Sequence, residues 1–107
     1  MMGVDPAAAV AALKEAGAAL VGCNCEISAA PMADLVPILA ALNGGVTCAQ
    51  PNAGQPRLEG GQTVYGETPE HFAAVVSGYP ALGARIVGGC CGTPPESIAA
   101  LAEALGR

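Results

Sequence analysis

Residues 83–93 read GARIVGGCCGT, a short apolar run that ends in two glycines and two adjacent cysteines. An apolar run of this length between glycines is typical of a strand that is buried on both faces of a sheet. Residues 17–25 read GAALVGCNC and follow the same pattern, with cysteine again at the end of the run. Recurring βα units alone would produce such a repeat, so it indicates two similar strands whose carboxyl ends carry cysteine.

Helices are expected to alternate with these strands. The last one should begin near Thr93, because Glu96 follows three positions later in the spacing of a capping box. Pro37 is tolerable in the second helix only in or near its first turn. The expected helices cover residues 6–16, 34–42, 68–83 (interrupted at Gly78 and Pro80) and 94–105, and the expected strands cover residues 19–25, 46–50 and 85–88. This alternation predicts an α/β fold with parallel βαβ units.

The composition narrows the classes of function. The 107 residues carry a net charge of −5, and the four basic residues are scattered, which argues against binding to nucleic acid. No apolar run approaches the roughly 20 residues of a membrane span. No secretory signal follows Met1, so a soluble, cytoplasmic protein is expected. Five cysteines, two of them adjacent, favour metal or catalytic chemistry over disulfides in a reducing compartment.

Cysteine or asparagine follows each expected strand. Cys25 ends the first, Asn52 follows the second, and Cys90 and Cys91 follow the third. Because the carboxyl ends of parallel strands meet at the edge where α/β folds bind ligands, these side chains are expected to converge. Three thiolates with an open fourth position form a catalytic type of zinc site. A zinc ion there would deprotonate a substrate thiol that is mostly protonated at neutral pH.

Three motifs resemble the signatures of the homocysteine S-methyltransferase family. Residues 22–25 (GCNC), 50–54 (QPNAG) and 88–93 (GGCCGT) are similar, in order and approximate spacing, to that family's GxNC, PNAG and GGCCGT. The likeness covers nearly the whole chain. It is greatest to the homocysteine-binding domains of cobalamin-dependent methionine synthases.

The resemblance implies both a fold and a reaction. Residues 1–107 would form a partial homocysteine-binding domain with the last three strands of a (β/α)8 TIM barrel, a fold that usually needs roughly 250 residues. Zinc, held by Cys25, Cys90 and Cys91, would activate the homocysteine thiolate for methyl transfer to give methionine, with cobalamin as the candidate methyl carrier. No further catalytic residue is implied. The expected partners are homocysteine and a complementary chain or corrinoid domain, or a second copy of the chain, because two sheet edges would stay open.

Other polar residues give weaker signals. Asn24 and Asn52 are candidate substrate-binding residues, and Asn52 matches the PNAG asparagine that lies close to the metal in related enzymes. A role in turn geometry before Gly54 is the alternative for Asn52. The remaining expectations are Cys23 and Cys48 as small packed side chains, Glu26 and Ser28 as loop contacts to substrate, His71 as a solvated side chain, and Thr68 and Thr93 as helix caps.

Two other functions stay open at this point. The chain could bind zinc without catalysing transfer, because much of the pocket for the amino-acid end of homocysteine would lie outside it. Alternatively, residues 88–93 could cradle a phosphate at a helix N-terminus. That hypothesis explains the glycines but leaves Cys25 and Cys91 unexplained. The long, glycine-rich segment at residues 51–66 is expected to be a functional loop.

Overall fold

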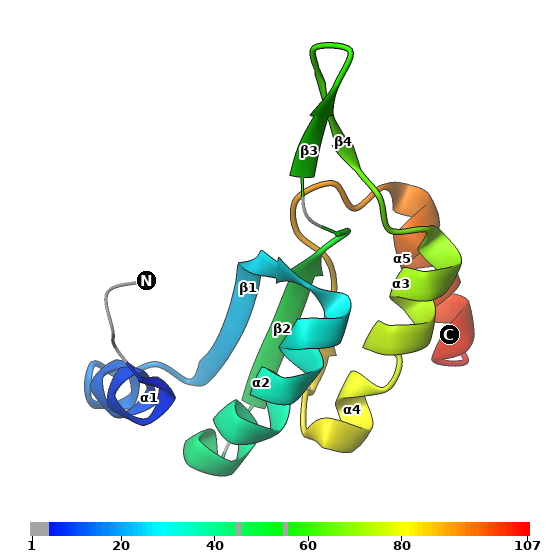
Figure 1. Ribbon diagram of the computed structural model, residues 1–107. Coiled ribbons are helices and arrows are strands. Elements are labelled where there is room, and N and C mark those ends of the chain that lie inside the picture. The colour runs from blue at the N-terminus through cyan, green and yellow to red at the C-terminus, as the bar shows by residue number, and fades with distance from the viewer. Residues whose placement is uncertain (1–4, 45, 55) are drawn as a thin grey trace.

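The computed structural model describes residues 5–44, 46–54 and 56–107. In Figure 1, α2 lies across a parallel sheet, α3 and α5 lie beside it, and a β-hairpin stands at the end to which the strands point. The elements in chain order are α1 (Pro6–Glu15), β1 (Leu20–Ser28), α2 (Ala29–Asn43), β2 (Val46–Asn52), β3 (Pro56–Glu59), β4 (Gln62–Tyr65), α3 (Pro69–Val76), α4 (Tyr79–Leu82), β5 (Ile86–Val87) and α5 (Pro95–Ala104). The expected α/β alternation is confirmed.

The sheet has the strand order β1–β2–β5, and both pairings are parallel. Gly22 pairs with Cys48, and Cys48 pairs with Ile86 on its other side. A Cβ atom on Gly22 would lie 2.2 Å from the carbonyl oxygen of Cys48, so glycine allows the two strands to approach this closely. The carboxyl ends of the three strands therefore meet at one edge, as parallel pairing requires.

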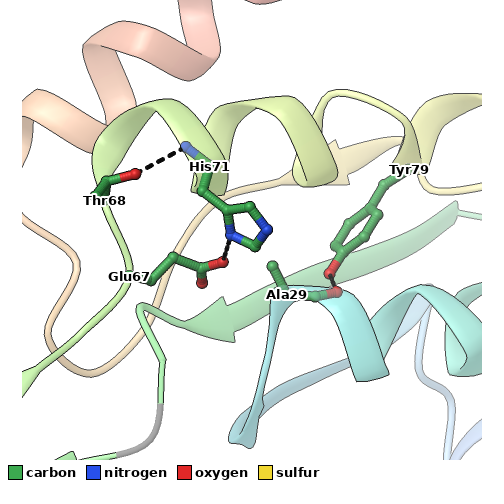
Figure 2. A network of polar contacts seen from close by, with 5 residues as sticks. All are labelled: Ala29, Glu67, Thr68, His71 and Tyr79. Carbon is green, nitrogen blue, oxygen red and sulfur yellow. Dashed lines mark hydrogen bonds and ion pairs between the residues drawn. The ribbon is translucent and has the colours of Figure 1, made fainter.

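The core lies between the sheet and the helices. Side chains alternate along β1: Val21 is buried towards the helices, whereas Leu20 on the opposite face is 46% exposed. Tyr79 is fully buried, and its hydroxyl donates a hydrogen bond of 2.5 Å to the carbonyl oxygen of Ala29, which ties α4 to the start of α2 (Figure 2). Burial raises the pKa of the Tyr79 hydroxyl, so it remains a protonated donor. The main cluster comprises Ala29, Met32, Val36, Ala49, Phe72, Ala73, Val76, Tyr79, Ala84 and Leu101.

Three boundaries depart most from expectation. The first strand runs to Ser28, three residues past the expected end at Cys25, so Glu26 and Ser28 lie within the strand and not in a loop. The second helix begins at Ala29, five residues before the expected residue 34, and Pro37 consequently lies inside it, well past the first turn. Packing explains the early start, since Ala29 and Met32 are both buried in the main cluster. The second strand continues through Pro51 to Asn52, although Pro51 was expected to break it.

The segment expected to be a long loop contains an antiparallel hairpin. β3 pairs with β4 from Glu59 opposite Gln62 to Pro56 opposite Tyr65. The turn between them is Gly60-Gly61, with φ of 56° and 81°. Positive φ at both central residues is what a two-residue type I′ turn requires.

One of the two expected threonine caps is present. Thr68 precedes α3, and its hydroxyl accepts a hydrogen bond of 3.1 Å from the backbone N–H of His71. Thr93 does not cap α5, which has Pro94 at the N-cap position and no side-chain cap. Instead, the Thr93 side chain lies where a Cβ on Gly89 would be, and its hydroxyl oxygen is buried without a hydrogen-bond partner.

Among residues 5–44, 46–54 and 56–107, no helix is both long enough and apolar enough to cross a membrane.

The contact between Gly22 and Cys48 gives a test of the sheet. We expect Gly22→Ala to destabilise the chain by about 1–3 kcal/mol, because the added methyl group meets backbone rather than a movable side chain. Gly78→Ala is the comparison: Gly78 has φ of −83°, and a Cβ there would lie 3.3 Å from the carbonyl oxygen of Val75, a much longer approach than at Gly22, so a clearly smaller effect is expected. Urea unfolding measures both variants. Equal effects would contradict the assigned pairing of β1 with β2.

The helix-free face of the sheet gives a second test. Leu20 in β1 and Ile86 in β5 lie on this face and are 46% and 43% exposed. β1 and β5 are the two edge strands of the described sheet. We expect the purified chain to associate in solution, because open parallel edges and exposed apolar side chains favour contact between copies. The double variant Leu20→Ser/Ile86→Ser should reduce the association, whereas Leu58→Ser in the hairpin should not. Light scattering after size-exclusion chromatography would show a single monomer peak if this expectation is wrong.

Candidate functional site

The first part of the candidate site is a bulge at the end of β1. Regular pairing with β2 continues to Asn24, and the register shifts before Ser28 pairs again. Between these positions Cys25 and Glu26 have φ of 58° and 61°, in the left-handed region that costs a non-glycine residue about 1–3 kcal/mol. Bulges redirect side chains, and this one brings the Cys25 Sγ to 3.4 Å from the Cys91 Sγ.

The second part is a tight turn at residues 90–93. The backbone N–H of Thr93 donates a hydrogen bond of 3.2 Å to the carbonyl oxygen of Cys90. Gly92 occupies the third position of this turn with φ of 76°, the value that a type II turn requires and that favours glycine. The N–H of Cys90 donates to the carbonyl oxygen of Pro51, so the turn is attached to the end of β2.

Asn52 connects the end of β2 to this turn. Its side chain is buried, and its Oδ1 accepts a hydrogen bond of 3.1 Å from the backbone N–H of Cys91. The carbonyl oxygen of Cys91 in turn accepts a hydrogen bond of 3.1 Å from the N–H of Ala53. The Asn52 side chain therefore fixes the Cys91 backbone, a role that its place in the sequence did not indicate.

The three cysteines named from the motifs lie together. The Sγ atoms of Cys25, Cys90 and Cys91 are all within 4.8 Å of one another. Two sulfur ligands of a tetrahedral zinc ion with bonds of roughly 2.3 Å lie about 3.8 Å apart, so this spacing fits one zinc. Cys25 and Cys90 are half-buried and Cys91 is exposed, which leaves one side of the cluster accessible. The Nδ2 of Asn24 lies 3.8 Å from the Cys90 Sγ and donates to it, which restrains that side chain.

The clustered thiols change each other's acidity. Hydrogen bonds from Cys90 and then Cys91 lower the pKa of Cys25, because they stabilise its thiolate. The same contact with Cys25 raises the pKa of Cys91 to about 11. Cys25 is therefore the more acidic thiol of this pair, and a cation bound between the two sulfur atoms would favour the thiolate form of both.

The other two cysteines lie outside this cluster. Cys23 packs against both groups of core residues, as expected for a small apolar side chain. Burial raises the pKa of the Cys23 thiol, and burial also raises that of Cys48. Both are consequently poor thiolate donors. Cys48, however, is half-buried and lines a hollow between β1 and β2, so its expected packing role stays a prediction.

Two hollows flank the strand that carries Cys25. One, of about 420 Å³, lies on the helix side of β1 and includes Glu26 and Met32 in its lining. The other, of about 230 Å³, is lined from β1 and β2 and includes Asn24 and Gln50. Asn24 thus contacts the thiol cluster and also lines an accessible hollow, where a polar part of a ligand could reach it.

Of the remaining candidates, His71 lies apart from the thiols, whereas Glu26 directly follows Cys25. His71 is largely exposed in the first turn of α3, and its Nδ1 contacts Glu67 Oε2 (Figure 2). Glu67 carries no motif or spacing that marks it in the sequence, yet its side chain is only 6% exposed and its Oε1 is buried without a hydrogen-bond partner. Glu26 is exposed within the bulge, and Ser28 immediately precedes α2 without capping it.

Comparison with known proteins identifies the family. The model of the homocysteine S-methyltransferase family matches residues 1–105. The chain is 33% identical over 108 residues to methionine synthase of Mycobacterium leprae (strain TN) and 32% identical over 106 residues to methionine synthase of Mycobacterium tuberculosis (strain ATCC 25618 / H37Rv). These alignments cover 100% and 98% of this chain, but the chain spans only 9% of the length of either relative. With the family model matching almost every residue, and with its three motifs meeting at one edge of the sheet, the chain belongs to the homocysteine S-methyltransferase family.

Proposed function

We propose that this chain supplies the zinc-binding and thiol-activating part of a methionine synthase-like homocysteine S-methyltransferase. The observation that carries the proposal is the convergence of the Cys25, Cys90 and Cys91 Sγ atoms within 4.8 Å of one another. Three sulfur donors with one accessible side are the donor set of a catalytic zinc site. The names of the relatives and of the family supply the reaction to which such a site belongs.

The chemistry requires the homocysteine thiol to lose its proton. Zinc, when bound, would supply this by taking the substrate sulfur as its fourth ligand and lowering the pKa of that thiol. Three cysteine thiolates would more than balance the charge of a divalent cation, which keeps electron density on the substrate sulfur. The accessible side beside Cys91 is where that sulfur would enter.

The two asparagines have different proposed roles. Asn52 Oδ1 is occupied by the N–H of Cys91, so we assign to Asn52 the positioning of that cysteine. Asn24 lines the hollow on the helix-free face, and its amide is suited to the polar end of an amino-acid substrate. In a (β/α)8 barrel that face would look into the interior, where the rest of the substrate pocket would lie.

The phosphate hypothesis is disfavoured by the hydrogen bonds of residues 88–93. A phosphate cradle needs backbone N–H groups that point outward to the anion. Here the N–H groups of Gly88, Cys90, Cys91 and Thr93 all donate to other groups of the protein. These four N–H groups are therefore not available to a phosphate.

The proposed enzyme needs more than these residues. Because the chain spans 9% of each relative, we propose that the remaining units of a (β/α)8 TIM barrel and a methyl carrier, cobalamin by family resemblance, lie on a longer polypeptide or a partner. A chain that binds zinc without transferring a methyl group is the second candidate. The exposed apolar face with Leu20 and Ile86 supports the need for further packing units in either case.

Zinc binding tests the proposal directly. We expect the reduced chain to bind one zinc ion, measured by metal analysis and by competition with a chelator. Cys25→Ala, Cys90→Ala or Cys91→Ala should each weaken zinc binding by more than about 100-fold, because each removes a ligand. Loss of a residue that only supports a ligand typically costs about 10–100-fold. Cys23→Ala and Cys48→Ala are matched controls that should keep the affinity. Loss of zinc in Cys23→Ala but not in Cys25→Ala would show that the GxNC motif is aligned wrongly.

Turnover tests the second half of the proposal. We expect negligible methionine from homocysteine and methylcobalamin with the chain alone. Activity should appear when a polypeptide supplies the remaining barrel units, because holding the reacting atoms in line can lower the barrier by roughly 7–11 kcal/mol. X-ray absorption at the zinc edge should report one additional sulfur when homocysteine is added. No additional sulfur even with the complement present would exclude homocysteine as the substrate, and rapid turnover by the chain alone would exclude the need for further units.

A further inference from the structure

The β3–β4 hairpin stands at the edge of the sheet where the thiols converge, although it contains no cysteine. Figure 1 shows the segment between β5 and α5 passing below the base of the hairpin. That segment contains the turn at residues 90–93, and a side-chain contact joins the two. The hairpin ends at Tyr65, whose ring is the point of contact.

The Tyr65 ring rests on Gly92. A Cβ atom placed on Gly92 would lie 2.1 Å from Cγ of Tyr65 and 2.4 and 2.5 Å from its two Cδ atoms. The three nearest atoms all belong to the near end of the ring, so the ring occupies the space that a side chain would need. Gly92 is therefore required twice, once by its φ of 76° and once by this contact.

The base of the hairpin is also attached to the cysteines through the backbone. The N–H of Glu67, two residues after Tyr65, donates a hydrogen bond of 3.2 Å to the carbonyl oxygen of Ala53. The N–H of Ala53 donates to the carbonyl oxygen of Cys91. Residues on both sides of the hairpin thus form a ladder that ends at one of the thiol-bearing residues.

The turn needs such a restraint. Glycine at positions 88, 89 and 92 would leave the segment wide conformational freedom without contacts to the rest of the protein, and Cys91 at its outer side is exposed. A ligand set that must first be ordered binds its metal more weakly, because part of the binding free energy is used for ordering. A ring packed on Gly92 removes freedom from the residue next to Cys91 before any ligand arrives.

We propose that Tyr65 is a positioning residue for the thiol cluster: its ring, carried by the hairpin, holds the turn at residues 90–93 in the conformation that brings the Cys90 and Cys91 thiols to Cys25. The inference rests on the proposed function only in taking these thiols as metal ligands. It assigns a role to a segment that contributes no ligand itself. Only the ring is required, because the contact atoms are Cγ and Cδ.

The experiment compares three variants of the full chain by zinc competition with a chelator and by the sulfur-to-metal absorption bands of the cobalt(II)-loaded protein. Tyr65→Ala should lose about 10–100-fold in zinc affinity, the range for outer-shell partners, and weaken the cobalt bands. Tyr65→Phe should stay within about threefold of the parent, because phenylalanine keeps the contact atoms. Leu58→Ala, an exposed hairpin position, is the matched control and should also keep the affinity. Circular dichroism checks that each variant is folded.

The outcomes separate this inference from the function on which it rests. If the parent chain binds zinc and Tyr65→Ala binds it equally well, the positioning role is wrong and the proposed function stands. If the parent chain binds no zinc, both fail. Should Tyr65→Ala unfold, Tyr65→Thr takes its place, because threonine suits a strand but lacks the ring and both Cδ contact atoms. In that variant, retained folding with at least a severalfold loss of zinc affinity supports the ring contact, and unchanged affinity overturns it.

Discussion

The close approach of β1 to β2 at Gly22 and Cys48 is the constraint on which the thiol site depends. With no side chain between the two backbones, the strands pair in one register up to Asn24. That register places the bulge containing Cys25 beside the end of β2, where Asn52 holds the backbone of Cys91. The sulfur atoms converge because the sheet determines where each strand ends. The short cysteine side chains are then long enough to bring their Sγ atoms within 4.8 Å of one another.

The parts that sequence predicted correctly depend on local signals. The apolar runs before Cys25 and Cys90, with their glycines, were enough to identify parallel strands whose carboxyl ends meet. The early start of α2 was missed because it follows from packing: Ala29 and Met32 are buried against elements distant in sequence, and this outweighs the unfavourable Pro37. Thr93 was misassigned as a cap for a similar reason, since its side chain fills the space above Gly89.

The hairpin and the role of Asn52 show what local reasoning leaves out. Gly60-Gly61 between two short polar runs is a readable signal for a type I′ turn, yet a two-stranded hairpin is marginal unless it packs on something else. Its support comes from Tyr65 against Gly92, residues 27 positions apart in sequence, which no window along the chain reveals. The buried hydrogen bond from Cys91 to Asn52 spans 39 positions and is equally non-local.

The left-handed backbone of Cys25 and Glu26 lowers the stability of the fold but positions the Cys25 sulfur. Two consecutive residues with side chains at positive φ store strain that glycine would not store, on the order of 1–3 kcal/mol each. Glycine at position 26 would release part of that strain and would also loosen the segment that aims the Cys25 sulfur. Selection for a more stable chain and selection for a fixed metal centre would therefore favour different residues at this position, a trade-off common at functional sites.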